Sequence, residues 1–236
     1  MKRVKLTELN HNAPDPRTVG LTILCRSISN FRAAVLLVQL DQALEAKVLV
    51  RLLYENLLWQ AALLEHGSEF VADMREDEIF NRKVLCELAV KFGEDVNAPE
   101  ALALRGTIKE LARQFSKPKK LKTSKTAVEG AVETAYFDYM RLSLNAMHCS
   151  VTALSRHLSI ERRNGRARPK LSLVAGTGAD EVLSTILHAC WVLIATAECT
   201  DELTGCTTAD APLAALQTEF VGNDWLDRMR RGGLYG

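Results

Sequence analysis

An arginine and a histidine lie seven residues apart in the stretch RLSLNAMHCSVTALSRHL, residues 141–158. On a helix Arg141 and His148 would share one side, about 20° apart and roughly 10.5 Å along the axis. Arginine offers a permanent charge and a planar fork for phosphate oxygens, and histidine exchanges a proton near neutral pH. Metal-free RNA cleavage needs both, because a base must deprotonate the ribose 2′-hydroxyl while a cation stabilises charge on phosphorus. The alternative is that His148 is a satisfied bundle histidine and Arg141 a solvated flank.

Two stripes run along the helix that this segment predicts, from after Gly130 to about Glu161. Apolar side chains recur in steps of three and four from Met140 to Leu158, which is typical of a core-facing seam. The polar stripe beside it consists of Arg141, Asn145, His148, Thr152 and Ser155. We expect the polar stripe to line a groove or a dimer interface, with Asn145 supporting the Arg–His pair.

A second helix must lie beside this one to complete a site. Residues 46–67 are hydrophobic nearly all round, yet they contain Arg51 and Glu55 one turn apart. These charges and the modest length argue against a membrane span, so we expect the central helix of a bundle. A buried charge must be paired. Either Arg51 and Glu55 form a structural ion pair, or Glu55 orients Arg141 or His148 from the facing helix.

Two basic segments, predicted to be exposed loops, flank the Arg–His helix. Clustered cations in a nearly neutral chain can follow a phosphate backbone, although solvated loops are commonly basic too. The candidate RNA-binding residues are Lys117, Lys119, Lys120, Lys122 and Lys125 in the first segment, and Arg162, Arg163, Arg166 and Arg168 in the second.

Composition limits the remaining choices. The net charge of +1 gives no overall attraction to nucleic acid or to membranes. Six cysteines without a CxxC pair predict reduced thiols in a cytoplasmic protein. We recognise no spacing typical of a zinc or di-iron site and no complete glycine motif for a nucleotide, so we expect no metal and no cofactor.

Helical periodicity recurs through most of the 236 residues. The sequence predicts an all-α, single-domain bundle of about seven helices over residues 21–231. Residues 1–20, with Pro14 and Pro16, are expected to form an irregular leader, and residues 232–236 a frayed tail.

The segments RLLYEN (51–56) and YMRLSLNAMHCS (139–150) together resemble a bacterial family of uncharacterised helical proteins. The family's hallmark is a segment with Tyr, Arg and Ser followed by His-x-Ser. This segment is in turn similar to the Arg-x4–6-His motif of the HEPN superfamily, in which Arg141 and His148 would be the motif pair. Catalytic members usually carry a polar residue directly after the arginine. Here that position is Leu142, and Asn145 could supply the polar group one turn later.

The resemblance implies a helical bundle that forms homodimers. It also implies a metal-independent endoribonuclease that acts as a toxin or an antiviral effector, with an antitoxin or defence-system protein as partner. His148 would then be the general acid/base, Arg141 the phosphate clamp, and Asn145 and Glu55 the supporting residues. Non-catalytic relatives imply an alternative: a silent helical module that binds a protein partner or a nucleotide-like ligand.

Overall fold

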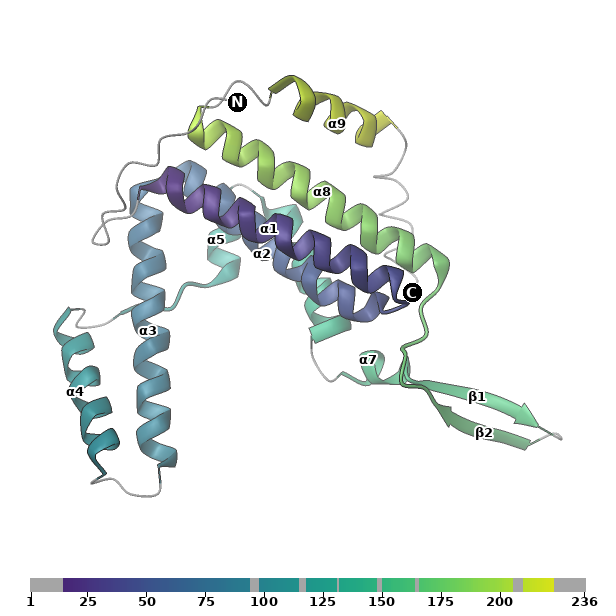
Figure 1. The fold of residues 1–236 in the computed structure, drawn as a ribbon, viewed down its shortest axis with the longest axis horizontal. Coiled ribbons are helices and arrows are strands. Elements are labelled where there is room, and N and C mark those ends of the chain that lie inside the picture. The colour runs from purple at the N-terminus through teal and green to yellow at the C-terminus, as the bar shows by residue number, and fades with distance from the viewer. Residues whose placement is uncertain are drawn as a thin grey trace.

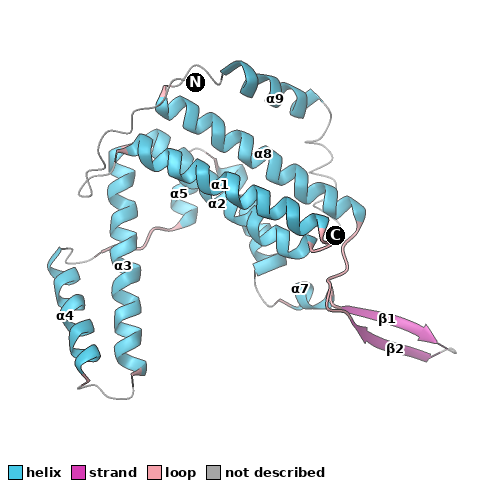
Figure 2. Cartoon of the chain, in the orientation of Figure 1, coloured by secondary structure: helices cyan, strands magenta, loops and turns pink. Residues whose placement is uncertain are grey.

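Helices account for about 81% of the residues that the computed structural model describes. These are residues 15–93, 98–114, 118–130, 132–147, 150–163, 166–205 and 210–222. The predicted all-α class is therefore confirmed (Figure 2). Within the described ranges there are nine α-helices rather than about seven, together with one π-helix and a small two-stranded sheet.

The elements follow one another along the chain with short connections. They are α1 (Pro16–Gln39), α2 (Ala43–His66), α3 (Ser68–Phe92), α4 (Pro99–Gln114), α5 (Thr123–Glu129), α6 (Glu133–Leu142), the π-helix η1 (Ser143–Met147), α7 (Val151–Ser155), β1 (Leu158–Arg163), β2 (Arg166–Leu171), α8 (Ala179–Thr204) and α9 (Asp210–Gly222).

The first helix begins earlier than the sequence predicted. Asp15 caps α1 by accepting a hydrogen bond from the backbone N–H of Arg17, and Pro16 occupies the first turn. Proline is favoured there because its missing N–H would be unpaired anyway and its φ suits a helix. Residues 16–20 therefore belong to α1, and the predicted leader is wrong for them. Residues 1–14 and the predicted tail, 232–236, lie outside the described residues.

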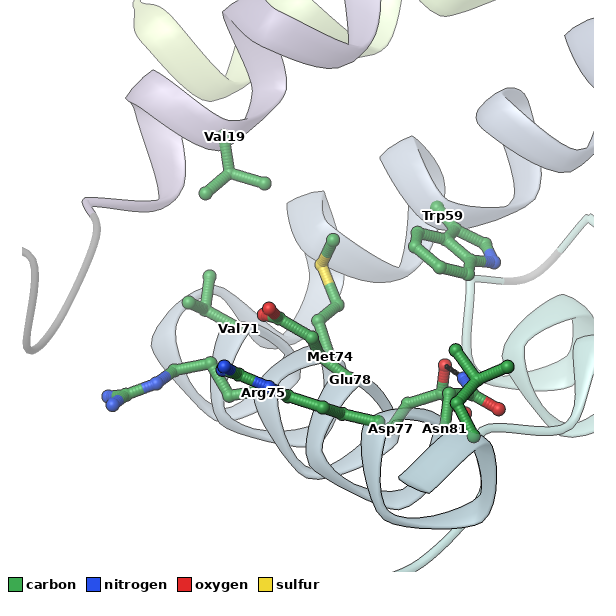
Figure 3. A pocket seen from close by; sticks show the side chains of 10 residues that line it. Val19, Trp59, Val71, Met74, Arg75, Asp77, Glu78 and Asn81 are labelled. Atoms are coloured by element: carbon green, nitrogen blue, oxygen red, sulfur yellow. Dashed lines mark hydrogen bonds between the residues drawn. The ribbon is translucent and has the colours of Figure 1, made fainter. Parts of the chain in front are cut away.

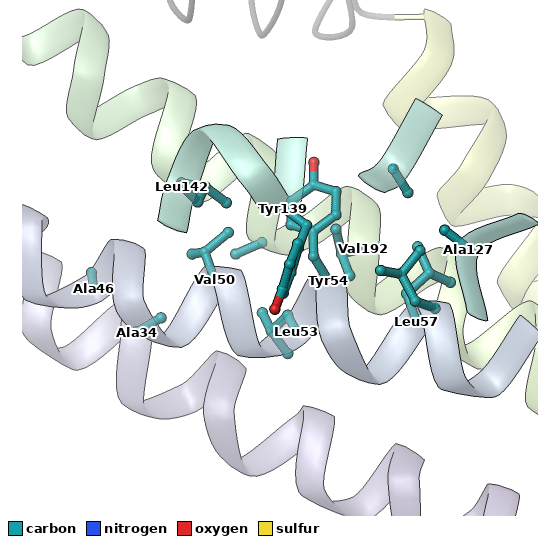
Figure 4. Packing of buried hydrophobic residues seen from close by; sticks show 13 residues of the cluster. Ala34, Ala46, Val50, Leu53, Tyr54, Leu57, Ala127, Tyr139, Leu142 and Val192 are labelled. Carbon is teal, nitrogen blue, oxygen red and sulfur yellow. The ribbon is translucent and has the colours of Figure 1, made fainter. Parts of the chain in front are cut away.

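The second helix is the central element, as predicted. It packs against α1, α3, α5, α6, η1 and α8, and Figure 4 shows the buried side chains gathered around it. Val50, Leu53, Tyr54 and Leu58 are completely buried. The all-round apolar character of its sequence follows from this position, because neighbouring helices cover most of its surface.

The third helix leaves the bundle as an arm. Gly67 separates it from α2 with φ 52° and ψ −121°, a conformation open in practice only to glycine. The first turns of α3 are buried at Phe70 and Val71, whereas its second half packs against α4. Figure 1 shows the α3–α4 pair projecting from the bundle.

The predicted long helix over residues 130–161 is wrong beyond its first part. The α-helical pattern ends at Leu142, changes to the π-helix, and resumes only for the five residues of α7. Ser143 Oγ donates to the Tyr139 carbonyl (2.8 Å), and Ser150 Oγ accepts from the Ala153 N–H (3.1 Å) to cap α7. Such local serine bonds compete with a continuous helix. The polar stripe is therefore not continuous.

The second predicted basic loop is instead a β-hairpin. β1 pairs with β2 antiparallel, from Leu158 opposite Leu171 to Arg163 opposite Arg166. Figure 1 shows it projecting beyond α7. Alternation along a strand gives the hairpin two unlike faces. One face carries Leu158, Ile160, Arg162, Ala167, Pro169 and Leu171, and the other carries Ser159, Glu161, Arg166, Arg168 and Lys170.

Two of the helices are apolar and long. By length and composition, α1 and α8 could each cross a membrane. Core helices of soluble proteins pass the same test, and here α1 and α8 pack against α2 and against each other.

Candidate functional site

Arg141 lies near the end of α6, and its side chain reaches α8. Its side chain is 19% exposed and forms an ion pair with Asp138 one turn earlier, with Nη2 3.0 Å from Oδ1. The same Nη2 is 2.8 Å from Nε2 of His188 on α8. These two contacts match the two hydrogens that Nη2 carries. The remaining N–H groups of the guanidinium, on Nε and Nη1, take no part in them.

His188 is the histidine that Arg141 contacts, and the sequence did not single it out. Its side chain is buried at 4% exposure. Burial, with smaller effects from Arg141 and Lys47, lowers its pKa to about 3. The imidazole is therefore neutral at physiological pH. An arginine only donates, so Nε2 must accept and Nδ1 must carry the proton.

Tyr54 and Asp138 close a ring with these two residues. The Nδ1–H of His188 donates to the Tyr54 hydroxyl over 2.5 Å, and that hydroxyl donates to Asp138 Oδ2 over 3.4 Å. Burial raises the pKa of Tyr54 well above its ordinary value, so the phenol keeps its proton. Burial also raises the pKa of Asp138, against the opposing effects of Arg141 and Tyr54. The ring joins α2, α6 and α8.

The Arg51–Glu55 ion pair is present on α2, with Nη1 2.9 Å from Oε2. Arg51 also donates from Nε to Ser143 Oγ (3.1 Å) and from Nη2 to the Tyr139 hydroxyl. Its guanidinium lies over the Tyr139 ring, 4.4 Å from the centroid. Arg51 thus holds the junction of α6 and η1. Within the described residues the partner of Glu55 is Arg51, which is the structural ion pair that the sequence offered as one of two alternatives.

A second group of charges lies at the start of α8. The carboxylate of Glu181 forms ion pairs with Lys47 of α2 and with Arg156 just after α7. Burial alone would raise the pKa of Glu181, but these two cations bring it below its ordinary value. Burial lowers the pKa of Lys47, and the positive charges of Arg156 and Arg141 add to this effect. Lys47, Arg156 and Arg141 therefore lie close enough for their charges to interact. The carboxylates of Glu181 and Asp138 offset these three positive charges.

Of the two remaining candidates of the Arg–His motif, the structure describes one. Asn145 is half-buried in η1. His148 lies outside the described residues, between η1 and Ser150. In the part of the chain that the structure describes, no three His, Cys, Asp or Glu side chains gather as metal ligands.

The two basic segments lie on different sides of the bundle (Figure 1). In the first, the backbone N–H groups of Lys119 and Leu121 donate to Glu76 and Asp77 on α3. The exposed lysines there are Lys119, Lys120, Lys122 and Lys125, the last two at the start of α5 and within it, and Lys117 lies outside the described residues. In the second, Arg162, Arg166 and Arg168 are exposed on the hairpin, and Arg163 ends β1.

Comparisons with known proteins point to one family. No curated protein and no solved structure matches this chain. The sequence pattern of one family matches residues 17–166, which include Arg51, Tyr54, Asp138 and Arg141 but end before His188. With well over half of its length matched, the chain belongs to the family of unknown function DUF5677.

Proposed function

We propose that this protein is a metal-independent, HEPN-like endoribonuclease of the cytoplasm, used as a toxin or an antiviral effector. In this proposal Arg141 stabilises the charge on the scissile phosphate and His148 moves the proton, with Asn145 beside them. A protein partner would hold the activity in check until it is needed.

The observation that carries the proposal is the way Arg141 is held. Asp138 and His188 engage its Nη2 alone, which leaves the N–H groups of Nε and Nη1 outside the ring. These groups carry part of the guanidinium charge, and each can donate a hydrogen bond to a phosphate oxygen. A cation fixed in advance stabilises a transition state better than one that must reorganise. The neutral state of His188 matters too, because a charged imidazole would repel the guanidinium.

The acid/base role falls to His148 rather than His188. His188 is buried, its pKa is lowered to about 3, and both its nitrogens are engaged in the ring. His148 follows directly after η1, and π-helical turns occur frequently at functional sites. In the reaction, the base removes the proton of the 2′-hydroxyl, whose oxygen attacks phosphorus. The bond to the 5′-oxygen breaks, and this oxygen takes a proton as it leaves, which gives a 2′,3′-cyclic phosphate and a 5′-hydroxyl.

The hairpin is the proposed contact with RNA outside the reacting phosphate. Arg166, Arg168 and Lys170 share one exposed face, with only Glu161 as an acidic neighbour on that face. Exposed cations at strand spacing can follow a phosphate backbone without reading bases. The first basic segment is a weaker candidate, because its backbone is bound to the carboxylates of Glu76 and Asp77.

The alternative is a catalytically silent module that binds a protein or a nucleotide-like ligand. The observation in its favour is the same ring, because an arginine that joins Asp138 and His188 has a structural role even without a substrate. Its modest exposure of 19% suits that role as well. In this reading Arg141 is retained for stability, and the hairpin is a docking surface.

Cleavage of total RNA in excess EDTA separates the two functions. The wild type is expected to leave 2′,3′-cyclic phosphate ends, and His148→Ala is expected to lose about 10²–10⁴ in rate with its unfolding midpoint unchanged. Arg141→Ala should lose both cleavage and stability. Arg105→Ala, at an exposed arginine of α4, is the control and should behave as the wild type. Wild-type protein that never cleaves, or cleavage that survives His148→Ala, would favour the module.

A further inference from the structure

The projecting helix α3 carries an uncovered heptad seam. Positions spaced alternately by three and four residues run along one side of it and include the exposed Leu85, Leu88 and Phe92, at 66, 42 and 75% exposure. The full seam is Val71, Met74, Glu78, Asn81, Leu85, Leu88 and Phe92. Such spacing keeps side chains on one face over many turns, which is the pattern of a helix that packs along another helix. The helix α4 packs on α3 and leaves Leu85, Leu88 and Phe92 exposed.

A cavity of about 630 Å³ lies along the same seam, from Val71 to Leu85. Figure 3 shows it between α3, the start of α1 and α2, with Val19, Trp59, Val71 and Met74 around its apolar part. Its volume falls within the range of sites that hold an apolar group. One helix thus presents an open cavity beside Val71 and Met74 and exposed apolar side chains from Leu85 to Phe92.

The charges of α3 are divided in the same way. Its first half, residues 68–80, contains five carboxylates and one arginine, and its second half, residues 81–92, contains three cations and one carboxylate. Two copies placed antiparallel would set each acidic half against a basic half, and each exposed apolar end against a cavity. A surface that is complementary to itself under a two-fold rotation is what a symmetric dimer requires.

We propose that this protein forms an antiparallel homodimer through α3, with the two-fold axis near Asn81 and Arg82. Phe92 of each copy fills the cavity of the other, beside Trp59 and Met74. Near the axis Glu78 of one copy lies within a turn of Arg82 of the partner subunit. A polar residue within an apolar seam, here Asn81, fixes the register. This interface is on α3 and does not depend on whether Arg141 takes part in catalysis.

Sedimentation equilibrium of the full-length chain tests the dimer. Phe92→Glu should raise the dimer Kd roughly 30-fold or more, the loss that a hot-spot side chain buried in a partner's pocket typically gives. Leu102→Glu is the matched control, because Leu102 is 54% exposed on α4 but lies off the seam, and it should leave the Kd unchanged. A wild type that stays monomeric at its highest soluble concentration, or a dimer that Phe92→Glu does not weaken, overturns the proposal.

Exchange of charges tests the orientation. Glu78→Arg and Arg82→Glu should each weaken self-association, because like charges then meet twice across the axis. An equimolar mixture should restore dimers at close to the wild-type Kd, since both contacts in the mixed dimer are of opposite charge. Circular dichroism should show wild-type helix content for each variant. A mixture that associates no better than either variant alone would rule out the antiparallel pairing.

Discussion

Replacing Tyr54 by phenylalanine removes one hydroxyl from the centre of the bundle and leaves the ring of the side chain in place. Tyr54 is completely buried, and its hydroxyl is the acceptor for the Nδ1–H of His188. Without it this donor is buried and unpaired, which typically costs about 1–3 kcal/mol. The weaker contact to Asp138, at 3.4 Å, adds little. For a chain of this length, the unfolding midpoint should fall by roughly 2–12 °C.

Thermal and urea unfolding followed by circular dichroism at pH 7 measure this loss. Tyr136→Phe is the matched control, because Tyr136 is only half-buried and stacks on Tyr139 at a centroid distance of 5.8 Å. Its hydroxyl is outside the ring, so the control should stay within about 0.5 kcal/mol of the wild type.

A double-mutant cycle with His188→Leu then tests whether the two side chains act together. A coupling energy of about 0.5–3 kcal/mol is expected for groups in one network. Nitrogen-15 NMR of the wild type should show His188 neutral, with its proton on Nδ1. A Tyr54→Phe variant as stable as the wild type, or strictly additive effects in the cycle, would show that the ring contributes nothing as a unit.

Two other perturbations probe the buried charges. The folded-state pKa of His188, about 3, is below its unfolded value, so the unfolded chain binds the extra proton first as the pH falls. The free energy of unfolding should therefore decrease between about pH 6.5 and pH 3, by at most about 1.4 kcal/mol per pH unit from this group. In urea unfolding at a series of pH values, His188→Leu should flatten this dependence. Glu55→Ala should lower the free energy of unfolding by about 1–2 kcal/mol, less than the ~3–5 kcal/mol of a fully buried pair, because Glu55 is 28% exposed and Arg51 keeps its bonds to Ser143 and Tyr139. The control Glu110→Ala breaks the exposed pair with Arg113 and should change the free energy of unfolding by under about 1 kcal/mol. Equal losses in both variants would show that the Arg51–Glu55 pair stabilises the fold no more than an exposed pair.

Hydrophobic periodicity was enough to identify the helices that are covered on several sides. The central position of α2 followed from its apolar run, and Pro99 occupies the first position of α4, where proline is favoured. The same periodicity failed between Gly130 and Glu161. Ser143 and Ser150 bond to nearby backbone groups there, and β1 pairs with β2. Those alternatives to helix are not visible in an apolar stripe, because they depend on backbone bonding rather than on burial.

The candidate site was predictable for Arg141 and not for its partner. Arg141 and His148 are close in sequence, so a spacing argument can find them, whereas Arg141 and His188 are brought together across 47 positions by the packing of α6 and α8 on α2. The available signal was weaker: His188 is the one ionisable ring in an otherwise apolar helix, and a buried polar group needs partners. Nothing in the sequence indicated a polar role for Tyr54, because it lies in an apolar segment rich in leucine.

The geometry of Arg141 relates the two proposed functions to each other. A guanidinium has five N–H groups, and the ring with Asp138 and His188 uses the two on Nη2. The structural role is therefore complete before any ligand arrives, and it leaves the N–H groups of Nε and Nη1 outside the ring. A lysine could pair with Asp138, but its single ammonium would not also offer N–H groups on other nitrogens to a phosphate. Under the proposed function the ring accounts for an arginine at this position, and losing this arginine would also remove the side-chain contact between α6 and α8.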